Sequence, residues 1–203
     1  MKSKFDPQKH HRRSIRLKGF DYSSEGAYYV TIVAQGRECL FGEVVDGEMK
    51  LNEAGEMVVK WWNELTNKFP NIELGEFIVM PNHFHGIIFI MANVGADLRV
   101  CPDGERVCPD GEENTSIQKG EHTGSPLRIS LSQMIQWFKT MTTNEYIRGV
   151  KQSNWKPFIG KVWQRNYYEH IIRNEKELQQ KTDYILDNPS RWEEDDENMA
   201  KLK

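Results

Sequence analysis

Two apolar runs that are separated by only two residues constrain the fold of this chain more than any other feature. Residues 73–80 (ELGEFIVM) and 83–91 (HFHGIIFIM) each have the length and composition of a β-strand, and Pro81-Asn82 between them favours a tight turn. The pair therefore predicts an antiparallel hairpin. Because both runs are so apolar, we expect both strands at the centre of a sheet.

Other segments carry equally local signals. Residues 27–34 (AYYVTIVA) are β-branched and aromatic and predict a strand, and turn residues within 37–52 favour a hairpin or an irregular edge. Residues 162–172 predict a last extended segment. Three helices are expected, each beginning after a capping residue: one from Asn52 to just before Pro70, one from Ser130, and one from Asn174 to Leu186, where Pro189 forbids continuation beyond Asn188. This order predicts an α+β fold, a ferredoxin-like antiparallel sheet with helices on one face.

The chain has 203 residues, enough for one domain, which we expect over 19–192. Its two ends carry opposite charges: residues 2–18 hold seven Lys or Arg against one acid, and residues 193–197 read EEDDE. The basic arm, residues 1–18, could contact phosphates, or it could be a solvated, mobile terminus. Residues 193–203 are interpreted as an acidic tail.

Membrane and secretory classes are not favoured. No run approaches the roughly 18 to 20 apolar residues that span a bilayer, and the N-terminus lacks the apolar segment of a secretory signal. The cysteines, Cys39, Cys101 and Cys108, give no disulfide framework. A cytoplasmic protein is therefore expected.

Residues 93–126 contain a direct duplication, RVCPDGE at 99–105 and again at 106–112. The repeated Cys-Pro-Asp-Gly suggests zinc, but Cys101 and Cys108 stand alone with only His122 nearby, whereas a structural zinc site uses four ligands in closer pairs. We interpret the segment as a mobile insertion in a surface loop.

His83 and His85 are candidate metal ligands. Side chains at i and i+2 of a strand project from the same face, so the two imidazoles lie side by side while Phe84 points into the core. The alternative is a pair of solvent-facing histidines, since His-x-His is common by chance. A third ligand would come from elsewhere in the chain. Tyr184 and Asn188 are four residues apart and share a helix face, where they could reach a metal-bound phosphate or could only pack and cap the helix.

The segment Pro81-Asn82-His83-Phe84-His85, with strands before and after it, resembles the HUH motif of single-tyrosine transposases. Residues 162–174 (VWQRNYYEHIIRN) and 184–189 (YILDNP) resemble the C-terminal signature of the REP-associated tyrosine transposases. Tyr29-Val30-Thr31 and Leu40-Phe41-Gly42 match the first strand and turn of that family. The resemblance extends from about Gly19 to Asn188, apart from the insertion, and implies an HUH-nuclease fold with a C-terminal tyrosine-bearing helix.

This resemblance implies a DNA transposase and nickase. Tyr184 matches the nucleophile, and Asn188 stands where related transposases carry a glutamine that binds Mg²⁺ or Mn²⁺ with the two histidines. Tyr184 would attack a phosphate of single-stranded or hairpin DNA, giving a 5′-phosphotyrosine and a free 3′-hydroxyl that can rejoin DNA. Tyr167 and Tyr168 are rival nucleophiles, and Glu169 and His170 are candidate accessory residues of the metal or DNA site.

Basic and aromatic residues complete the expected DNA contacts. Trp163 and Tyr167 could stack on bases or simply pack in the core. The candidate phosphate contacts are Lys9, Arg12, Arg13, Arg16, Lys18, Arg165 and Arg173. Relatives of this kind include monomers and dimers that exchange the tyrosine helix, so a homodimer is compatible with the resemblance. Two other hypotheses stay open: a non-catalytic protein that binds DNA hairpins, and a metal-dependent hydrolase that uses the histidines without Tyr184.

Overall fold

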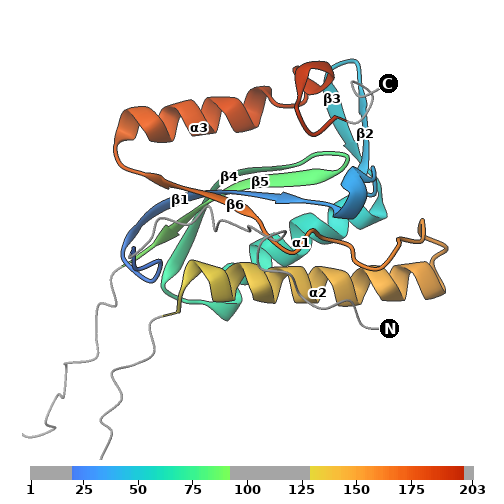
Figure 1. Cartoon of the computed structure of the whole chain (residues 1–203), viewed down its shortest axis with the longest axis horizontal. Coiled ribbons are helices and arrows are strands. Elements are labelled where there is room, and N and C mark those ends of the chain that lie inside the picture. Colours follow the sequence, from blue (N-terminus) through green and yellow to red (C-terminus); the bar gives the residue numbers. More distant parts are fainter. Residues whose placement is uncertain (1–19, 92–128, 199–203) are drawn as a thin grey trace, which may run out of the picture.

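The computed structural model describes residues 20–91 and 129–198 (Figure 1). The predicted basic arm with Lys9, Arg12, Arg13, Arg16 and Lys18, and the insertion with its duplicated repeat, lie outside these residues. In the described part of the chain, no helix is long and apolar enough to cross a bilayer. The elements in chain order are β1 (Gly26–Val33), η1 (Gln35–Arg37), β2 (Gly42–Val45), β3 (Glu48–Leu51), α1 (Glu53–Lys68), β4 (Ile72–Val79), β5 (His83–Ile90), α2 (Leu131–Gln152), β6 (Tyr168–Ile172), α3 (Glu175–Asp187) and η2 (Trp192–Glu194).

An antiparallel sheet of order β4-β5-β1-β6 forms the centre of the fold, which confirms the predicted α+β class. The β4–β5 hairpin is confirmed, and the Met80 N–H donates to the His83 carbonyl to close its turn (2.8 Å). The expectation that both strands are central was wrong for β4, which pairs only with β5 and lies at the edge of this sheet. Its apolar side chains are buried (Ile72 and Val79) or partly buried (Leu74, Phe77 and Ile78), because α1 and α3 contact the strand.

The three predicted helix starts are confirmed. Asn52 Oδ1 accepts the Gly55 N–H (3.0 Å), and Asn174 Oδ1 accepts the Glu177 N–H (2.9 Å). Ser130 caps α2, where its backbone N–H donates to the Gln133 carboxamide (2.8 Å). Each bond satisfies a backbone or capping group that the first helical turn leaves without an internal partner.

Helices cover both faces of the sheet. Figure 1 shows α1 and α2 beneath the sheet and α3 above it. The larger core lies on the α1–α2 side, where Phe84 contacts Trp62 and Phe138 with ring centroids 4.4 and 5.5 Å apart. A smaller core lies under α3, and its fully buried members include Ile87 and Ile185. The predicted pair of helices on one face is therefore completed by the tyrosine-bearing helix on the other.

Candidate metal and tyrosine centre

The paired histidines project from β5 towards α3. His83 lies opposite Val33 and His85 opposite Thr31 on the central strand β1, while Phe84 points into the opposite core as predicted. The imidazole centroids are 4.5 Å apart. The exposed fractions of His83 and His85 are 0% and 4%, so the alternative of a solvent-facing pair was wrong.

Asn82 determines which nitrogen of His83 carries a proton. Its amide group donates to the carbonyl oxygens of Arg37 (3.1 Å) and Glu197 (2.7 Å), which leaves Asn82 Oδ1 as an acceptor. His83 Nδ1 lies 2.9 Å from that oxygen and therefore donates to it. The other nitrogen, Nε2, then presents its lone pair to the site, as a metal ligand requires.

His85 is held in a similar way by two hydroxyl groups. Its Nδ1 lies 2.7 Å from the Tyr29 hydroxyl and 2.9 Å from Thr31 Oγ1. Either oxygen can accept the Nδ1 proton, which leaves Nε2 as the free lone pair. Burial raises the pKa of Tyr29 far above its usual value, so the phenol stays neutral and keeps its place in this contact.

Three buried acceptor atoms lie at this centre, two of them on the histidines themselves. Within residues 20–91 and 129–198, Nε2 of His83, Nε2 of His85 and Oδ1 of Asn188 have no hydrogen-bond partner. Asp195 adds a carboxylate whose Oδ2 lies 3.9 Å from His83 Nε2, and His83, His85 and Asp195 offer ligand atoms within 4.8 Å of one another. Buried polar atoms are almost always satisfied in native proteins, so this cluster fits a cation that would satisfy them together.

The pKa shifts of the two imidazoles agree with a role as metal ligands. Burial lowers the pKa of His83, although the negative charges of Asp195 and Glu197 oppose the shift. Burial, followed by the charges of His83 and Lys181, lowers the pKa of His85 well below its usual range. Both side chains are therefore neutral at physiological pH, and a neutral imidazole is the form that binds a metal.

Helix α3 brings Tyr184 and Asn188 to the same place within one chain. The Tyr184 ring centroid lies 5.3 Å from that of His85, and Tyr184 is 40% exposed, so solvent and substrate can reach it. Asn188 is buried, and its Nδ2 lies 3.5 Å from Asp195 Oδ2. Burial and the Asp195 charge raise the pKa of Tyr184, while the Asn188 amide opposes the rise.

The rival tyrosines differ in their positions. Tyr168 lies opposite Thr31 on β1, so it shares the histidine face of the sheet, and it is 45% exposed. Tyr167 instead contacts the ammonium group of Lys139 from α2, with Nζ 5.3 Å from the ring centroid. Both line a 460 Å³ pocket that also reaches His85 and Tyr184.

The predicted accessory residues are not part of the ligand cluster. Glu169 lies opposite Val30, on the face of the sheet away from the histidines. His170 shares the histidine face, but its Nε2 lies 3.6 Å from Glu177. Arg165 and Arg173 are exposed, and Arg165 lines a groove next to the site.

Sequence reasoning did not assign Asp195, Asn82 or Lys181 to this centre. Residues 193–203 were expected to be an acidic tail, yet Asp195 lies against His83, and Glu197 forms an ion pair with Arg37. Asn82 was interpreted only as a turn residue. The one sequence signal for Asp195 was its closeness to Asn188, since a ligand at Asn188 would place the next few residues near the metal.

Comparisons with known proteins agree with this architecture. No family model matches the chain. It is 38% identical over 200 residues to an uncharacterized protein of Haemophilus influenzae, across 96% of this chain and 97% of that protein. A solved structure, that of the REP-associated tyrosine transposase bound to a REP hairpin, is similar with a TM-score of 0.51 at 18% identity, covering 89% of this chain and 74% of the other. The expected likeness to that transposase is therefore confirmed for the fold, and the chain belongs to one family with the Haemophilus influenzae protein.

Proposed function

We propose that this protein cuts and rejoins single-stranded or hairpin DNA through a covalent bond between Tyr184 and a phosphate. One observation carries the proposal: the buried, unpartnered Nε2 atoms of His83 and His85 lie beside a partly exposed tyrosine on the next layer of the fold. The fold of the REP-associated tyrosine transposase, whose structure holds a REP hairpin, supports hairpin DNA as the substrate class.

The residues present fit a divalent cation, Mg²⁺ or Mn²⁺. His83 and His85 would hold it through Nε2, with oxygen ligands from Asn188 and Asp195. A mixed nitrogen and oxygen set without thiolate suits such ions better than a structural zinc site. When bound, the cation would polarise a non-bridging oxygen of the scissile phosphate.

Tyr184 supplies the covalent chemistry. Its oxygen attacks phosphorus, a phosphotyrosine bond forms, and the bond from phosphorus to the 3′ oxygen breaks, leaving a 3′-hydroxyl. The phenol is protonated at neutral pH because its pKa is raised, so a base must take its proton. Tyr184 is 40% exposed, so water takes this proton, and water also protonates the 3′ oxygen as it leaves. The Asp195 carboxylate, whose Oδ1 accepts the Glu197 N–H, keeps Oδ2 for the cation. Attack by a 3′-hydroxyl on the phosphotyrosine reverses the step and releases the tyrosine.

Lys181 is the basic residue of the site that the sequence did not indicate. It lines the pocket with His85 and Tyr184, and its ammonium lies 4.7 Å from the centroid of the Tyr29 ring. From there it would contact a phosphate held next to Tyr184. Tyr184 contacts His85 of its own chain, so we assign the site to a single protomer.

A second candidate function is a non-catalytic protein that binds DNA hairpins. The observation that favours it is the row Asp195, Asp196 and Glu197 along the same pocket, because carboxylates repel a scissile phosphate. The two functions differ in whether a covalent adduct forms.

The test is incubation of the full chain with a labelled DNA hairpin that has single-stranded flanks, in the presence of Mn²⁺. We expect an adduct that survives denaturing electrophoresis and is lost in Tyr184→Phe but kept in the matched control Tyr168→Phe. An adduct lost only in Tyr168→Phe would refute the assignment of Tyr184. Binding without an adduct in the wild type would favour the non-catalytic function, and cleavage that survives Tyr184→Phe would indicate a hydrolase.

A further inference from the structure

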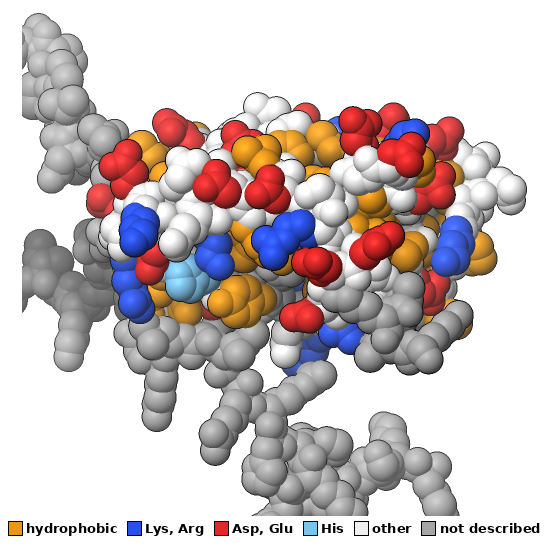
Figure 2. Space-filling view, turned by 90° about the horizontal axis from the view of Figure 1, so that it is seen from above, with side chains coloured by type: hydrophobic (Ala, Val, Ile, Leu, Met, Phe, Trp, Pro, Cys, Tyr) orange, Lys and Arg blue, Asp and Glu red, His pale blue; other side chains and the backbone are white. Residues whose placement is uncertain are grey.

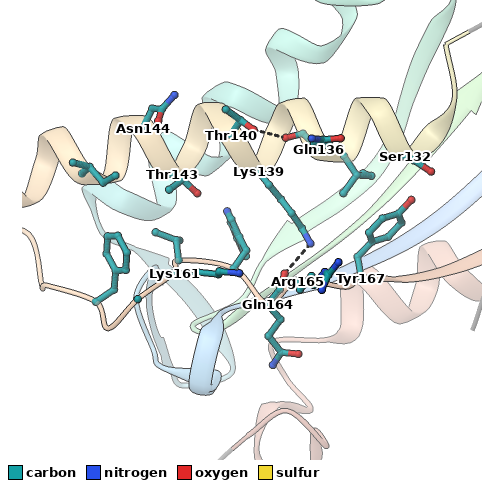
Figure 3. Close-up of a pocket in the computed structure, with 16 residues that line it drawn as sticks. Ser132, Gln136, Lys139, Thr140, Thr143, Asn144, Lys161, Gln164, Arg165 and Tyr167 are labelled. Atoms are coloured by element: carbon teal, nitrogen blue, oxygen red, sulfur yellow. Dashed lines mark hydrogen bonds between the residues drawn. The ribbon is translucent and has the colours of Figure 1, made fainter. Parts of the chain in front are cut away.

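A groove outside the tyrosine centre runs between α2 and the segment 158–167. Figure 3 shows its walls, with polar side chains of α2 on one side and Lys161, Gln164 and Arg165 on the other. Lys139 Nζ reaches across from α2 and donates to the carbonyl oxygens of Gln164 and Asn166, both at 3.1 Å. The cavity has a volume of about 740 Å³, within the range of ~300–1,000 Å³ that ligand pockets occupy.

The charge of this groove differs from that of the whole chain. Of the described residues that line it, three are cationic (Lys139, Lys161 and Arg165) and none carries a carboxylate. An adjoining cavity of about 580 Å³ shares Lys161 and Arg165 and also lacks acidic lining residues. The chain as a whole has 30 acidic residues against 27 Lys and Arg, and Figure 2 shows acidic side chains spread over the α3 side. A carboxylate-free lining in such a protein favours an anionic ligand.

The groove is continuous with the tyrosine centre. Gln164 and Tyr167 line both the groove and the pocket that contains His85 and Tyr184. Asn166 lines that pocket and the adjoining cavity. The three cavities therefore follow the segment 158–167 around the edge of the sheet, from the α2 side to the histidine side. A linear polyanion can follow the two carboxylate-free cavities into the third, where Lys181 and the proposed cation would offset the charges of Asp195, Asp196 and Glu197. A small metabolite would fill only one cavity.

We propose that this groove binds the single-stranded DNA next to the cleaved phosphate, an inference that rests on the proposed function. Lys161 and Arg165 contact phosphates, since both are exposed and lie along two of the cavities. Gln136 and Asn144 on α2 present amide groups to base edges, and Tyr167 at the junction of the pockets offers a ring for stacking. Base edges are accessible in this way in a single strand, whereas in a duplex they are paired and stacked.

Lys139 organises the groove. Burial lowers its pKa to about 8, so it is still mostly charged at neutral pH and can hold the two carbonyl oxygens in place. Its ammonium also lies against the Tyr167 ring. One partly buried cation thus holds the segment that carries Lys161, Arg165 and Tyr167 against α2.

The test measures binding of fluorescein-labelled decathymidylate by anisotropy, without divalent metal and in a Tyr184→Phe background, so that cleavage plays no part. We expect the double variant Lys161→Gln/Arg165→Gln to bind about tenfold more weakly. Its slope of log affinity against log salt should be lower by about 1.4, or ~0.7 for each phosphate that is no longer neutralised. Tyr167→Leu should weaken binding at least about fivefold if a base stacks on it. The matched control is Lys68→Gln/Arg148→Gln, which removes two exposed cations that do not line the groove.

Unchanged decathymidylate binding in the Lys161 and Arg165 double variant would overturn the proposal, even if the adduct assay succeeds. An equal loss of affinity for a blunt hairpin without flanks would also overturn it, because the groove would then contact duplex backbone. Displacement of the labelled DNA by equal amounts of decauridylate would refute DNA as the ligand. A missing adduct in the wild type, together with the expected weakening of decathymidylate binding, would refute only the cleavage reaction.

Discussion

Asn82 offers the sharpest test of how the candidate metal centre is built. Its side chain is fully buried and makes three hydrogen bonds, to the Arg37 and Glu197 carbonyl oxygens and to His83 Nδ1. Asn82→Leu keeps the approximate size but leaves three partners without a hydrogen bond. At roughly 1 kcal/mol for each, the free energy of unfolding should fall by up to about 3 kcal/mol. Loss of the bond that orients a metal-binding histidine should weaken Mn²⁺ binding by about 10- to 100-fold.

Isothermal titration with Mn²⁺ and urea denaturation of the metal-free protein measure these two effects separately. Asn82→Asp is the informative control, because a carboxylate still accepts the His83 Nδ1 proton but cannot donate to the two carbonyl groups. It should therefore lose stability and keep most of the Mn²⁺ affinity. If Asn82→Leu is folded and binds Mn²⁺ as tightly as the wild type, Asn82 does not set the tautomer of His83.

Two further predictions concern residues of β5, the strand that follows Asn82. Because burial lowers the pKa values of His83 and His85, the unfolded chain binds more protons than the folded one below about pH 6.5. The free energy of unfolding of the metal-free protein should then fall as pH drops below that value, by up to about 1.4 kcal/mol per pH unit for each histidine that stays neutral. Urea denaturation measures this change, and equal stability at pH 7 and pH 5.5 would contradict the prediction. Gly86→Ala should destabilise the protein by about 1–3 kcal/mol, since an added Cβ would lie 2.5 Å from Trp62 Cζ2 and 2.8 Å from Phe84 Cε1. Thermal unfolding of this variant at the wild-type temperature would show that the core under α1 and α2 can adjust.

Local features of the fold could be predicted because their causes are local. The caps at Asn52, Ser130 and Asn174 and the turn of the hairpin depend on residues within a few positions of one another. The placement of β4 at the sheet edge could not be predicted in this way, because an apolar run shows only that a strand is buried. Helices that contact both faces of an edge strand bury it as effectively as neighbouring strands would.

The second helical layer had a sequence signal that was overlooked. Along β5, Phe84 and Ile88 face one side, whereas Ile87 and Phe89 face the other side together with the histidines. A strand with apolar residues on both faces needs cover on both, and α3 provides the second cover. The apolar residues on both faces of 83–91 therefore favour a helix over the histidines as well as over Phe84.

The candidate site could be predicted as far as its motif residues extend. His83, His85, Tyr184 and Asn188 come together as expected, although their roles stay predictions. The closeness of Asp195 to Asn188 was too weak a signal to distinguish it, because five consecutive acids are typical of a solvated segment and only the folded chain brings one of them to His83.

The pairing of β5 along both of its edges has a consequence for how a cation would be held. His85 lies on a strand with a neighbour along each edge, opposite Thr31 of β1 and Ile78 of β4, so its position is fixed when the sheet forms. The two histidine ligands therefore have little conformational entropy left to lose when an ion binds. In zinc-finger peptides binding and folding are a single event, whereas here a chelator should remove the ion and leave a protein that still unfolds cooperatively. Exchange of one divalent ion for another would then change the rate of the proposed reaction and leave the protein structure unchanged.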